Sequence, residues 1–175
     1  MGLIIEQGSC SDLDKIEALY NELNDALAEG INYPGWRKGV YPVRDDAKKG
    51  LEEGGLFIAK QDGIIVGSII LNHDQEEGYD TVAWLSEAKE REVFVIHTLV
   101  VHPNYKGQEI GKNLMLFAED YARQCKMKSI RLDVYEKNIP AIKLYEKCGY
   151  QYLQTIDLGL GCYGLDWFKI FEKVL

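Results

Sequence analysis

The sequence predicts an α/β fold, in which a mixed sheet carries helices on both faces. Three observations support this class. Apolar residues recur at helical spacing at Leu13, Ile16 and Tyr20, Val93–Val101 is a β-branched run typical of a strand, and Asp62-Gly63 marks a hairpin turn between two apolar runs. A length of 175 residues with 46% apolar and 27% charged residues fits a single globular domain over residues 1–175.

The expected elements alternate along the chain. Strand Leu3–Glu6 leads into a helix that begins at Ser11, where Asp14 completes a capping-box pattern, and that ends at Gly30. A second helix is expected over Val43–Glu53. The elements that follow are strands Leu56–Lys60 and Ile64–Leu71, a polar loop Asn72–Arg91, strand Val93–Val101, helix Gln108–Lys126, strand Ile130–Tyr135, helix Ile139–Cys148, and strands Tyr150–Asp157 and Leu165–Phe171.

Composition argues against several classes of partner. The chain has 20 Lys and Arg against 28 Asp and Glu, a formal net charge of −8, whereas nucleic-acid binding needs a concentrated positive field. No apolar run is long enough to span a membrane, and the segment Met1–Glu6 lacks the basic region and the long apolar stretch of a signal peptide. Four widely spaced cysteines without a C-x-x-C pair indicate neither a metal site nor a disulfide framework. We therefore expect a cytoplasmic protein that binds no nucleic acid, membrane or metal.

One stretch has the form of an anion-binding turn. Val100–Lys112 runs from the end of a strand through a turn at Gly107 into a helix, and Lys106 adds positive charge. Amides at a helix N-terminus, together with the helix dipole, suit a phosphate or pyrophosphate. An ordinary strand–turn–helix connection would have the same form. A Walker loop is excluded because only three residues separate Gly107 from Gly111.

A G-x-G-x-x-G pattern elsewhere in the chain also fails as a nucleotide-binding motif. It starts at Gly159, close to the C-terminus, and leads into an expected strand rather than a helix, so it cannot build a dinucleotide-binding βαβ unit.

A further stretch, Asn138–Tyr150, follows the strand Ile130–Tyr135 and reads Asn-Ile-Pro-Ala-Ile-Lys-Leu-Tyr-Glu-Lys-Cys-Gly-Tyr. Together with Val101–Gly111 it resembles the GNAT superfamily of N-acetyltransferases, which transfer an acetyl group from acetyl-CoA to amines. The order of the expected elements is similar too, so the resemblance covers most of the chain. It implies a mostly antiparallel central sheet whose two central strands splay apart and hold coenzyme A.

The resemblance also implies roles for individual residues, with acetyl-CoA as cosubstrate and no metal. The Leu99 N–H would stabilise the oxyanion of the thioester, and the Tyr145 phenol would protonate the departing thiolate. Glu109 stands where the family pattern has glycine, and its carboxylate is expected to repel the phosphates. The implied cofactor contacts are Leu99, Val100, Val101, Lys106, Gly107, Gln108, Glu109, Ile110, Gly111, Lys112, Asn138, Ala141 and Tyr145.

The amine must lose a proton before it attacks, and an imidazole is suited to accept it. Period-two alternation in the strand Val93–Val101 puts His97 on the side of Val95 and Leu99, and the segment resembles the matching strand of arylalkylamine N-acetyltransferases, where a His serves this role through water. A core histidine bonded to a carbonyl is the alternative. His73 and Glu92 are alternative bases.

The acceptor is less well indicated by the sequence. The resemblance places Tyr33, Trp36 and Tyr41 in a loop over the acceptor, with contributions from His73 and Trp84, although the same rings could pack the loop onto the sheet. An acidic run, Asp74, Glu76, Glu77 and Asp80, could attract a cationic amine or be a solvated loop. A small-molecule amine is the favoured acceptor. A protein N-terminus or lysine, and a CoA-binding regulatory module without turnover, are the alternatives, and the resemblance is compatible with a homodimer.

Overall fold

The computed structural model describes residues 2–175, so Met1 lies outside the described residues. Seven strands form one sheet in the order β1-β2-β3-β4-β5-β7-β6. The β4–β5 pair is parallel, and the pairs β1–β2, β2–β3, β5–β7 and β6–β7 are antiparallel. The expected mixed, mostly antiparallel sheet is thereby confirmed.

The chain divides into two compact units. The first comprises the chain up to Asn32, Trp36–Asn72 and His97–Phe117, and the second comprises Tyr33–Gly35, His73–Ile96 and the chain from Ala118. Two elements, β4 and α3, run from one unit into the other. The elements are β1 (Ile4–Gln7), α1 (Leu13–Glu29), α2 (Arg44–Glu52), β2 (Leu56–Gln61), β3 (Ile64–Asn72), β4 (Val93–Val101), α3 (Ile110–Gln124), β5 (Ser129–Tyr135), α4 (Ile139–Lys147), β6 (Gln151–Ile156) and β7 (Phe168–Val174).

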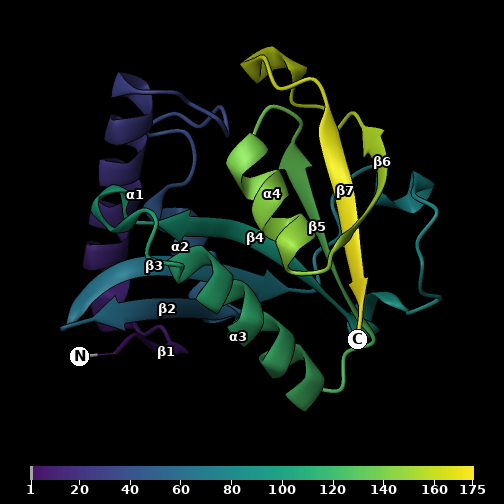
Figure 1. Cartoon of the computed structure of the whole chain (residues 1–175), viewed down its shortest axis with the longest axis horizontal. Helices are drawn as coiled ribbons and strands as arrows, with labels where there is room; N and C mark the ends of the chain where they lie inside the picture. Colours follow the sequence, from purple (N-terminus) through teal and green to yellow (C-terminus); the bar gives the residue numbers. More distant parts are fainter. Residues whose placement is uncertain (1) are drawn as a thin grey trace. The chain divides into compact units, whose positions relative to one another are not determined.

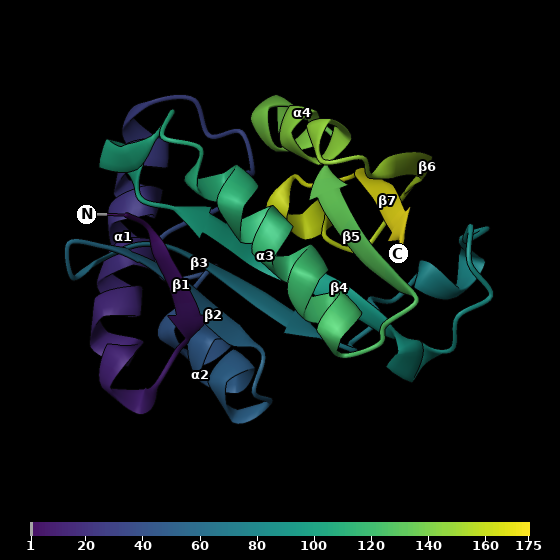
Figure 2. The same ribbon diagram turned by 60° about the horizontal axis from the view of Figure 1, so that its bottom comes forward.

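In the first unit, helices cover both faces of the strands, and β1, β2 and β3 lie side by side (Figures 1 and 2). On one face, Leu56 and Ile58 of β2 pack with apolar residues of α1 and α2. On the other face, Phe57 contacts Phe117 of α3, with ring centroids 4.9 Å apart. A Cβ at Gly67 of β3 would lie only about 3.0 Å from side-chain and backbone atoms. This glycine therefore lets the start of α3 approach the sheet closely.

In the second unit, β7 lies between β5 and β6 (Figure 1). The α4 helix packs on β7, where the rings of Tyr145 and Phe171 have centroids 6.2 Å apart. An apolar cluster of the second unit includes Tyr79, Val95 of β4 and Ile170 of β7. The parallel ladder joins Val93–Val95 to Ser129–Arg131, and both strands continue beyond it.

Several expected boundaries differ from the structure for identifiable reasons. The capping box forms at Ser9 rather than Ser11, because Asp12 accepts hydrogen bonds from the Ser9 N–H (2.9 Å) and hydroxyl (2.7 Å). A 3₁₀ turn then precedes α1. The α3 helix begins at Ile110 rather than Gln108, because Glu109 has a left-handed backbone (φ 59°). The last strand begins at Phe168 rather than Leu165, after a 3₁₀ turn that ends at Gly164.

Two further findings concern the chain as a whole. None of the four cysteines forms a disulfide within the described part of the chain, and Cys10 and Cys162 are exposed. Among residues 2–175, no helix is both long and apolar enough to cross a membrane.

Candidate active site

The second half of β4 contains a strained residue. Thr98 has φ of 50°, a left-handed conformation that β-branched side chains rarely adopt. Its buried hydroxyl shares a 2.5 Å hydrogen bond with the phenol of Tyr41. Strained backbone of this kind persists only where its surroundings hold it, and it is concentrated at functional sites. The strain therefore singles out the segment around Thr98, between His97 and Leu99, as a candidate site.

The same residue corrects the alternation argument for β4. In the second unit, Phe94 stacks on Tyr121 of α3, with ring centroids 5.7 Å apart. In the first unit, Val100 packs with α1 and α2, on the face away from α3. Phe94 and Val100 are six positions apart and would share a face in a regular strand, but here they face opposite sides. The prediction that Val95 and Leu99 share a face is therefore wrong. The left-handed residue interrupts the two-residue period.

The sequence-predicted base His97 lies next to this irregularity. Its side chain is partly buried, and its Nε2 atom is shielded from solvent. Leu99, on the other side of Thr98, is also partly exposed, whereas Val100 is fully buried. The role of His97 as a base stays a prediction.

The turn after β4 is shaped by histidine and glycine. His102 accepts a hydrogen bond at Nδ1 from the Asn104 N–H (3.1 Å), so its Nε2–H donates to the Glu22 carboxylate (2.7 Å). His102 thus holds the start of the turn. Gly107 has φ of 82°, and nothing lies within 4 Å of its missing Cβ.

The start of α3 presents the amides expected of an anion-binding turn. The Asn113 N–H donates to the Glu109 carbonyl at 2.9 Å, so the amides that precede it belong to the first helical turn, which leaves them without helical partners. Lys106 to Glu109 are exposed, whereas Ile110 is buried and fixes the helix to the sheet.

Glu109 combines an unusual residue with an unusual backbone. A left-handed φ of 59° favours glycine, which gives a physical reason for the glycine of the family pattern. The exposed Glu109 carboxylate lies 3.5 Å from the ammonium of Lys112. Part of its negative charge is therefore balanced locally, although an exposed pair of this kind contributes little stability.

In the second unit, Tyr145 is buried on α4 (6% exposed), with its ring near those of Tyr150 and Phe171. Burial raises the pKa of its phenol, and the charge of Asp133 adds to the rise. The phenol therefore keeps its proton at neutral pH and can act as a proton donor. Asn138 is the N-cap residue of α4, and Ala141 lies in its first turn.

The aromatic residues of the 31–42 segment fall into both units. In the first unit, the rings of Trp36 and Tyr41 meet edge to face at 5.4 Å, and Trp36 packs against the core that α1 and α2 share. The Asn32 amide donates to the Trp36 carbonyl at 2.7 Å and ties the loop together. Tyr33 belongs to the second unit. These contacts give Trp36 and Tyr41 a packing role. A contact of these rings with the acceptor stays a prediction.

The two alternative bases have their own partners. The Nδ1 atom of His73 lies 2.8 Å from the Val93 carbonyl, and its ring stacks on Phe94. Glu92 forms a 2.9 Å ion pair with Lys128, and this hydrogen-bonded partner holds the pKa of the carboxyl below its usual range. A lowered pKa makes Glu92 a weak base.

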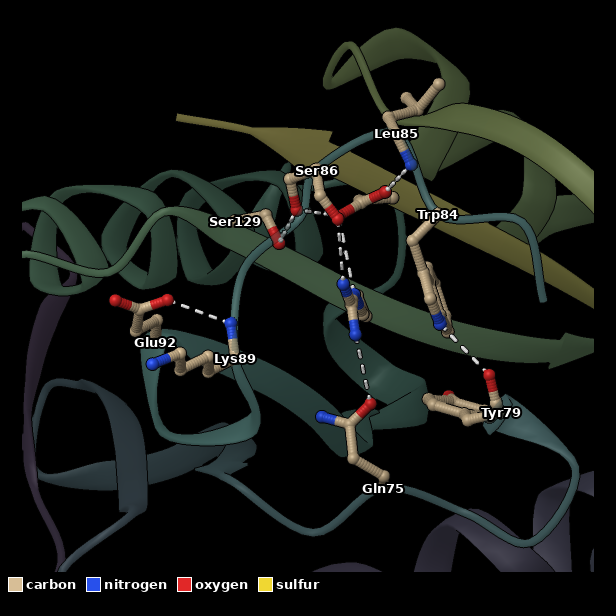
Figure 3. A network of polar contacts seen from close by, with 10 residues as sticks. Gln75, Tyr79, Trp84, Leu85, Ser86, Lys89, Glu92 and Ser129 are labelled. Atoms are coloured by element: carbon tan, nitrogen blue, oxygen red, sulfur yellow. Dashed lines mark hydrogen bonds and ion pairs between the residues drawn. The ribbon is translucent and has the colours of Figure 1, made fainter. Parts of the chain in front are cut away.

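Trp84 sits in a polar network of the second unit (Figure 3). The guanidinium of Arg131 lies 3.9 Å from the centre of the Trp84 ring. The Nε1–H of Trp84 donates a hydrogen bond to the Tyr79 carbonyl at 3.0 Å. The Arg131 Nε lies 3.3 Å from the fully buried Glu172, which also accepts from the Leu85 N–H and the Ser86 hydroxyl, both at 2.6 Å. These contacts give Trp84 a structural role.

Sequence reasoning missed Thr98, Tyr79 and the Arg131–Glu172 pair. Nothing in the order of the residues signals a left-handed threonine within a strand. The pair joins residues 41 positions apart, so no local pattern reveals it. The one available signal is that an Arg and a Glu each stand in an apolar strand segment, where a buried charge needs a partner. Among residues 2–175, no three His, Cys, Asp or Glu side chains are placed to hold a metal ion.

Comparison with known proteins places this chain in a family. The Acetyltransferase (GNAT) family matches residues 16–150, which take in most of both units. An uncharacterized N-acetyltransferase of Methanocaldococcus jannaschii is 28% identical over 70% of the chain, and a streptothricin acetyltransferase of Escherichia coli is 31% identical over 67%. The chain spans 47% and 57% of these two proteins, respectively.

An aminoalkylphosphonate N-acetyltransferase of Salmonella typhimurium is matched more evenly, at 27% identity over 84% of each protein. Solved structures share the fold. A GNAT acetyltransferase of Streptococcus agalactiae superposes with a TM-score of 0.79 at 21% identity, covering 100% of this chain and 96% of that one. A Salmonella typhimurium protein solved with its cofactor acetyl-CoA gives 0.71 at 16% identity, covering 100% and 95%.

The family match and the shared fold thus define an acetyltransferase-type protein. The chain belongs to the Acetyltransferase (GNAT) family.

Proposed function

We propose that this protein is an acetyl-CoA-dependent N-acetyltransferase that transfers the acetyl group directly to a primary amine of a small molecule. The observation that carries the proposal is the turn at the start of α3, where Gly107 and Glu109 are both left-handed and the first helical amides follow the strained end of β4. Such a turn can bind a pyrophosphate through backbone N–H groups and the helix dipole.

The residues at this turn fit an anionic cosubstrate. Lys106, Gln108 and Lys112 are exposed at the turn and can approach phosphates, and Gly107 adds no side chain. Following the family pattern, we assign the pantetheine arm to the backbone of Leu99 to Val101 and to α4. The full set of proposed cofactor residues is Leu99, Val100, Val101, Lys106, Gly107, Gln108, Glu109, Ile110, Gly111, Lys112, Asn138, Ala141 and Tyr145.

Three residues would carry the chemistry. His97 accepts the proton of the acceptor's ammonium through a water molecule, so that the neutral amine can attack the thioester carbonyl. The Leu99 N–H donates a hydrogen bond to the oxygen on which negative charge develops. The neutral phenol of Tyr145 supplies the proton that the departing thiolate takes up.

The remaining assignments rest on family resemblance and composition. We propose that the whole chain acts as one cytoplasmic acetyltransferase domain, compatible with a homodimer, and that Tyr33, Trp36, Tyr41, His73 and Trp84 line or support the acceptor site. A side chain must be at least partly exposed to contact an acceptor. All five of these side chains are partly exposed, which supports the assignment.

The test is thiol release from acetyl-CoA against polyamines, arylalkylamines, aminoglycosides, amino acids and short peptides. Turnover with one class of small amine is expected, and mass spectrometry should find the acetyl group on its nitrogen. Turnover with peptides alone would replace the small-molecule acceptor by a protein. Binding of acetyl-CoA without turnover by any acceptor would contradict the proposed activity.

A further inference from the structure

A tyrosine contacts the strained residue of β4 from the segment that precedes α2. The Tyr41 phenol and the Thr98 hydroxyl share a 2.5 Å hydrogen bond, and Thr98 is only 7% exposed. Loss of a partner is costly for a buried hydroxyl, because water cannot easily replace it. The bond therefore favours the backbone conformation of Thr98 in which its hydroxyl meets the phenol.

Tyr41 is itself fixed within the first unit. Its carbonyl accepts a hydrogen bond from the side-chain amide of Asn24 on α1 at 3.1 Å, and Asn24 is only 2% exposed. Its N–H donates to the Arg37 carbonyl at 3.0 Å, and its ring meets that of Trp36 edge to face. The backbone of Tyr41 is thus anchored on α1, while its phenol extends to β4. All of these residues, and Thr98, belong to the same unit.

The conformation of Thr98 affects the directions of both of its neighbours. In a regular strand, residues two positions apart present their side chains to the same face. The left-handed φ of 50° at Thr98 interrupts this pattern between His97 and Leu99, which are the proposed base and the proposed oxyanion donor. The mutual orientation of these two groups therefore depends on Thr98. Catalysis is sensitive to such orientation, since a misplacement of about 1 Å can cost about 100-fold in rate.

We propose that Tyr41 is a positioning residue for acetyl transfer, because its phenol holds Thr98 in the left-handed conformation. Thr98 in turn sets the directions of the His97 side chain and of the Leu99 N–H. A β-branched residue disfavours positive φ on its own, so the surroundings must hold it there, and the hydrogen bond to Tyr41 is the contact that does so. This inference rests on the proposed acetyltransferase function and deepens it.

Two variants remove the hydrogen bond, one from each side. Tyr41→Phe keeps the aromatic ring, and Thr98→Val keeps the β-branched shape. Each should lower kcat about 10- to 100-fold with the amine of the panel above that the wild type acetylates fastest. The Kd of acetyl-CoA should stay within about threefold of the wild type, because the proposed pyrophosphate contacts lie in the turn before α3. Thiol release and calorimetry measure the two quantities.

Glycine at position 98 separates positioning from packing and from contact with the acceptor. Glycine adopts positive φ without a side chain to hold it there, so Thr98→Gly should keep measurable turnover. Adding Tyr41→Phe to Thr98→Gly should then lower kcat by no more than about threefold. A phenol that only packs, or that contacts the acceptor, would cause the same loss in both backgrounds. An equal loss in both backgrounds overturns the inference, as does the absence of turnover in Thr98→Gly.

The matched control is Tyr20→Phe, which also removes a buried phenol from the first unit, on α1 one turn before Asn24. Its kcat should stay within about twofold of the wild type. A wild-type kcat in Tyr41→Phe contradicts the inference, and so does a loss in Tyr20→Phe as large as that in Tyr41→Phe. Thermal unfolding checks that each variant is folded at the assay temperature.

Crystal structures of the wild type and of Tyr41→Phe in the same crystal form separate this inference from the proposed function. If the wild type binds acetyl-CoA but acetylates no amine, the proposed function fails, and the backbone at residue 98 still shows whether Tyr41 holds Thr98. A Thr98 that leaves the left-handed region in the variant supports the inference. A Thr98 that keeps its positive φ without the phenol overturns it.

Discussion

The phenol of Tyr145 combines burial with a neighbouring negative charge, and both keep it protonated. Tyr145→Phe removes only the hydroxyl and keeps the ring packed on Phe171. If the phenol protonates the departing thiolate, turnover should fall by ~10²-fold or more, whereas the affinity for acetyl-CoA should change little. Steady-state thiol release and calorimetry measure the two quantities.

Tyr150→Phe is the matched control for this prediction, because Tyr150 is also a buried tyrosine, with its ring 6.3 Å from that of Tyr145. Its turnover should stay within about twofold of the wild type. A Tyr145→Phe variant with full turnover, under conditions where acetyl transfer limits the rate, would exclude the phenol as the acid.

Glu109 invites a test that separates charge from conformation. Glu109→Gly removes both the carboxylate and the cost of a left-handed side-chain residue, which is about 1–2 kcal/mol. We expect acetyl-CoA to bind a few-fold more tightly, with a smaller gain at high salt, because the charge is exposed. Calorimetry at two salt concentrations measures the change.

Glu109→Gln is the companion variant, since it removes the charge and keeps the side chain. If repulsion weakens binding, both variants should tighten it. Unchanged or weaker binding in both would remove the repulsion argument and leave conformation as the role of the family's glycine.

Some of these residue properties were visible in the sequence and others were not. The departure at Glu109 could be seen because the motif has a fixed spacing, and the structure adds the left-handed backbone that explains why the family pattern has glycine there. Thr98 could not be seen, because its partner Tyr41 lies 57 positions away in the sequence. Local pattern carries no information about such a contact.

At the scale of elements, the buried Arg131–Glu172 pair ties β5 and β7 to the segment around Ser86. Arg131→Met leaves Glu172 buried with an unbalanced charge, which should lower the free energy of unfolding by about 3–5 kcal/mol. The double variant Arg131→Met, Glu172→Met should lose less, because no charge remains to be buried. Urea denaturation compares them, and a double variant less stable than the single one would argue against this electrostatic account.

The elements themselves were largely predictable. β4 spans Val93–Val101 as expected from its β-branched run, and Asp62-Gly63 forms the β2–β3 turn with both residues at positive φ. The start of α1 was misplaced because Ser9 and Ser11 both precede an aspartate by three residues, and local pattern cannot choose between them. The position of β7 between β5 and β6 depends on pairing between distant residues.

At the scale of the whole molecule, buried phenols should make the fold sensitive to alkali. Burial raises the pKa of Tyr20, Tyr145 and Tyr150 above the ordinary value of 10.0. Above pH 10 the unfolded chain therefore loses protons that the folded chain retains, and stability falls as the pH rises. Each phenol contributes a slope of about 1.4 kcal/mol per pH unit. Urea denaturation between pH 8 and about pH 11 measures the slope.

Tyr20→Phe should make this slope shallower, and Tyr152→Phe, at an exposed position, should not. Equal slopes in the wild type and the Tyr20→Phe variant would show that other groups, such as lysines, determine the alkaline limit.

The family and the order of elements could be predicted because two motifs at a fixed separation accompany a matching series of helices and strands. The division of the chain into two units could not, since it cuts through β4 and α3, where the sequence shows no linker. A boundary inside regular elements leaves no trace in composition.

The two exposed cysteines give the molecule an experimental use. Cys10 lies in the first unit and Cys162 in the second, whereas Cys125 and Cys148 are half-buried. Thiol-reactive dyes should therefore label one position in each unit of the natural sequence, and energy transfer between them would follow the separation of the units in solution as acetyl-CoA is added. The same two thiols would react with thiol-detecting reagents, so a Cys10→Ser, Cys162→Ser variant is the proper background for measuring coenzyme A release.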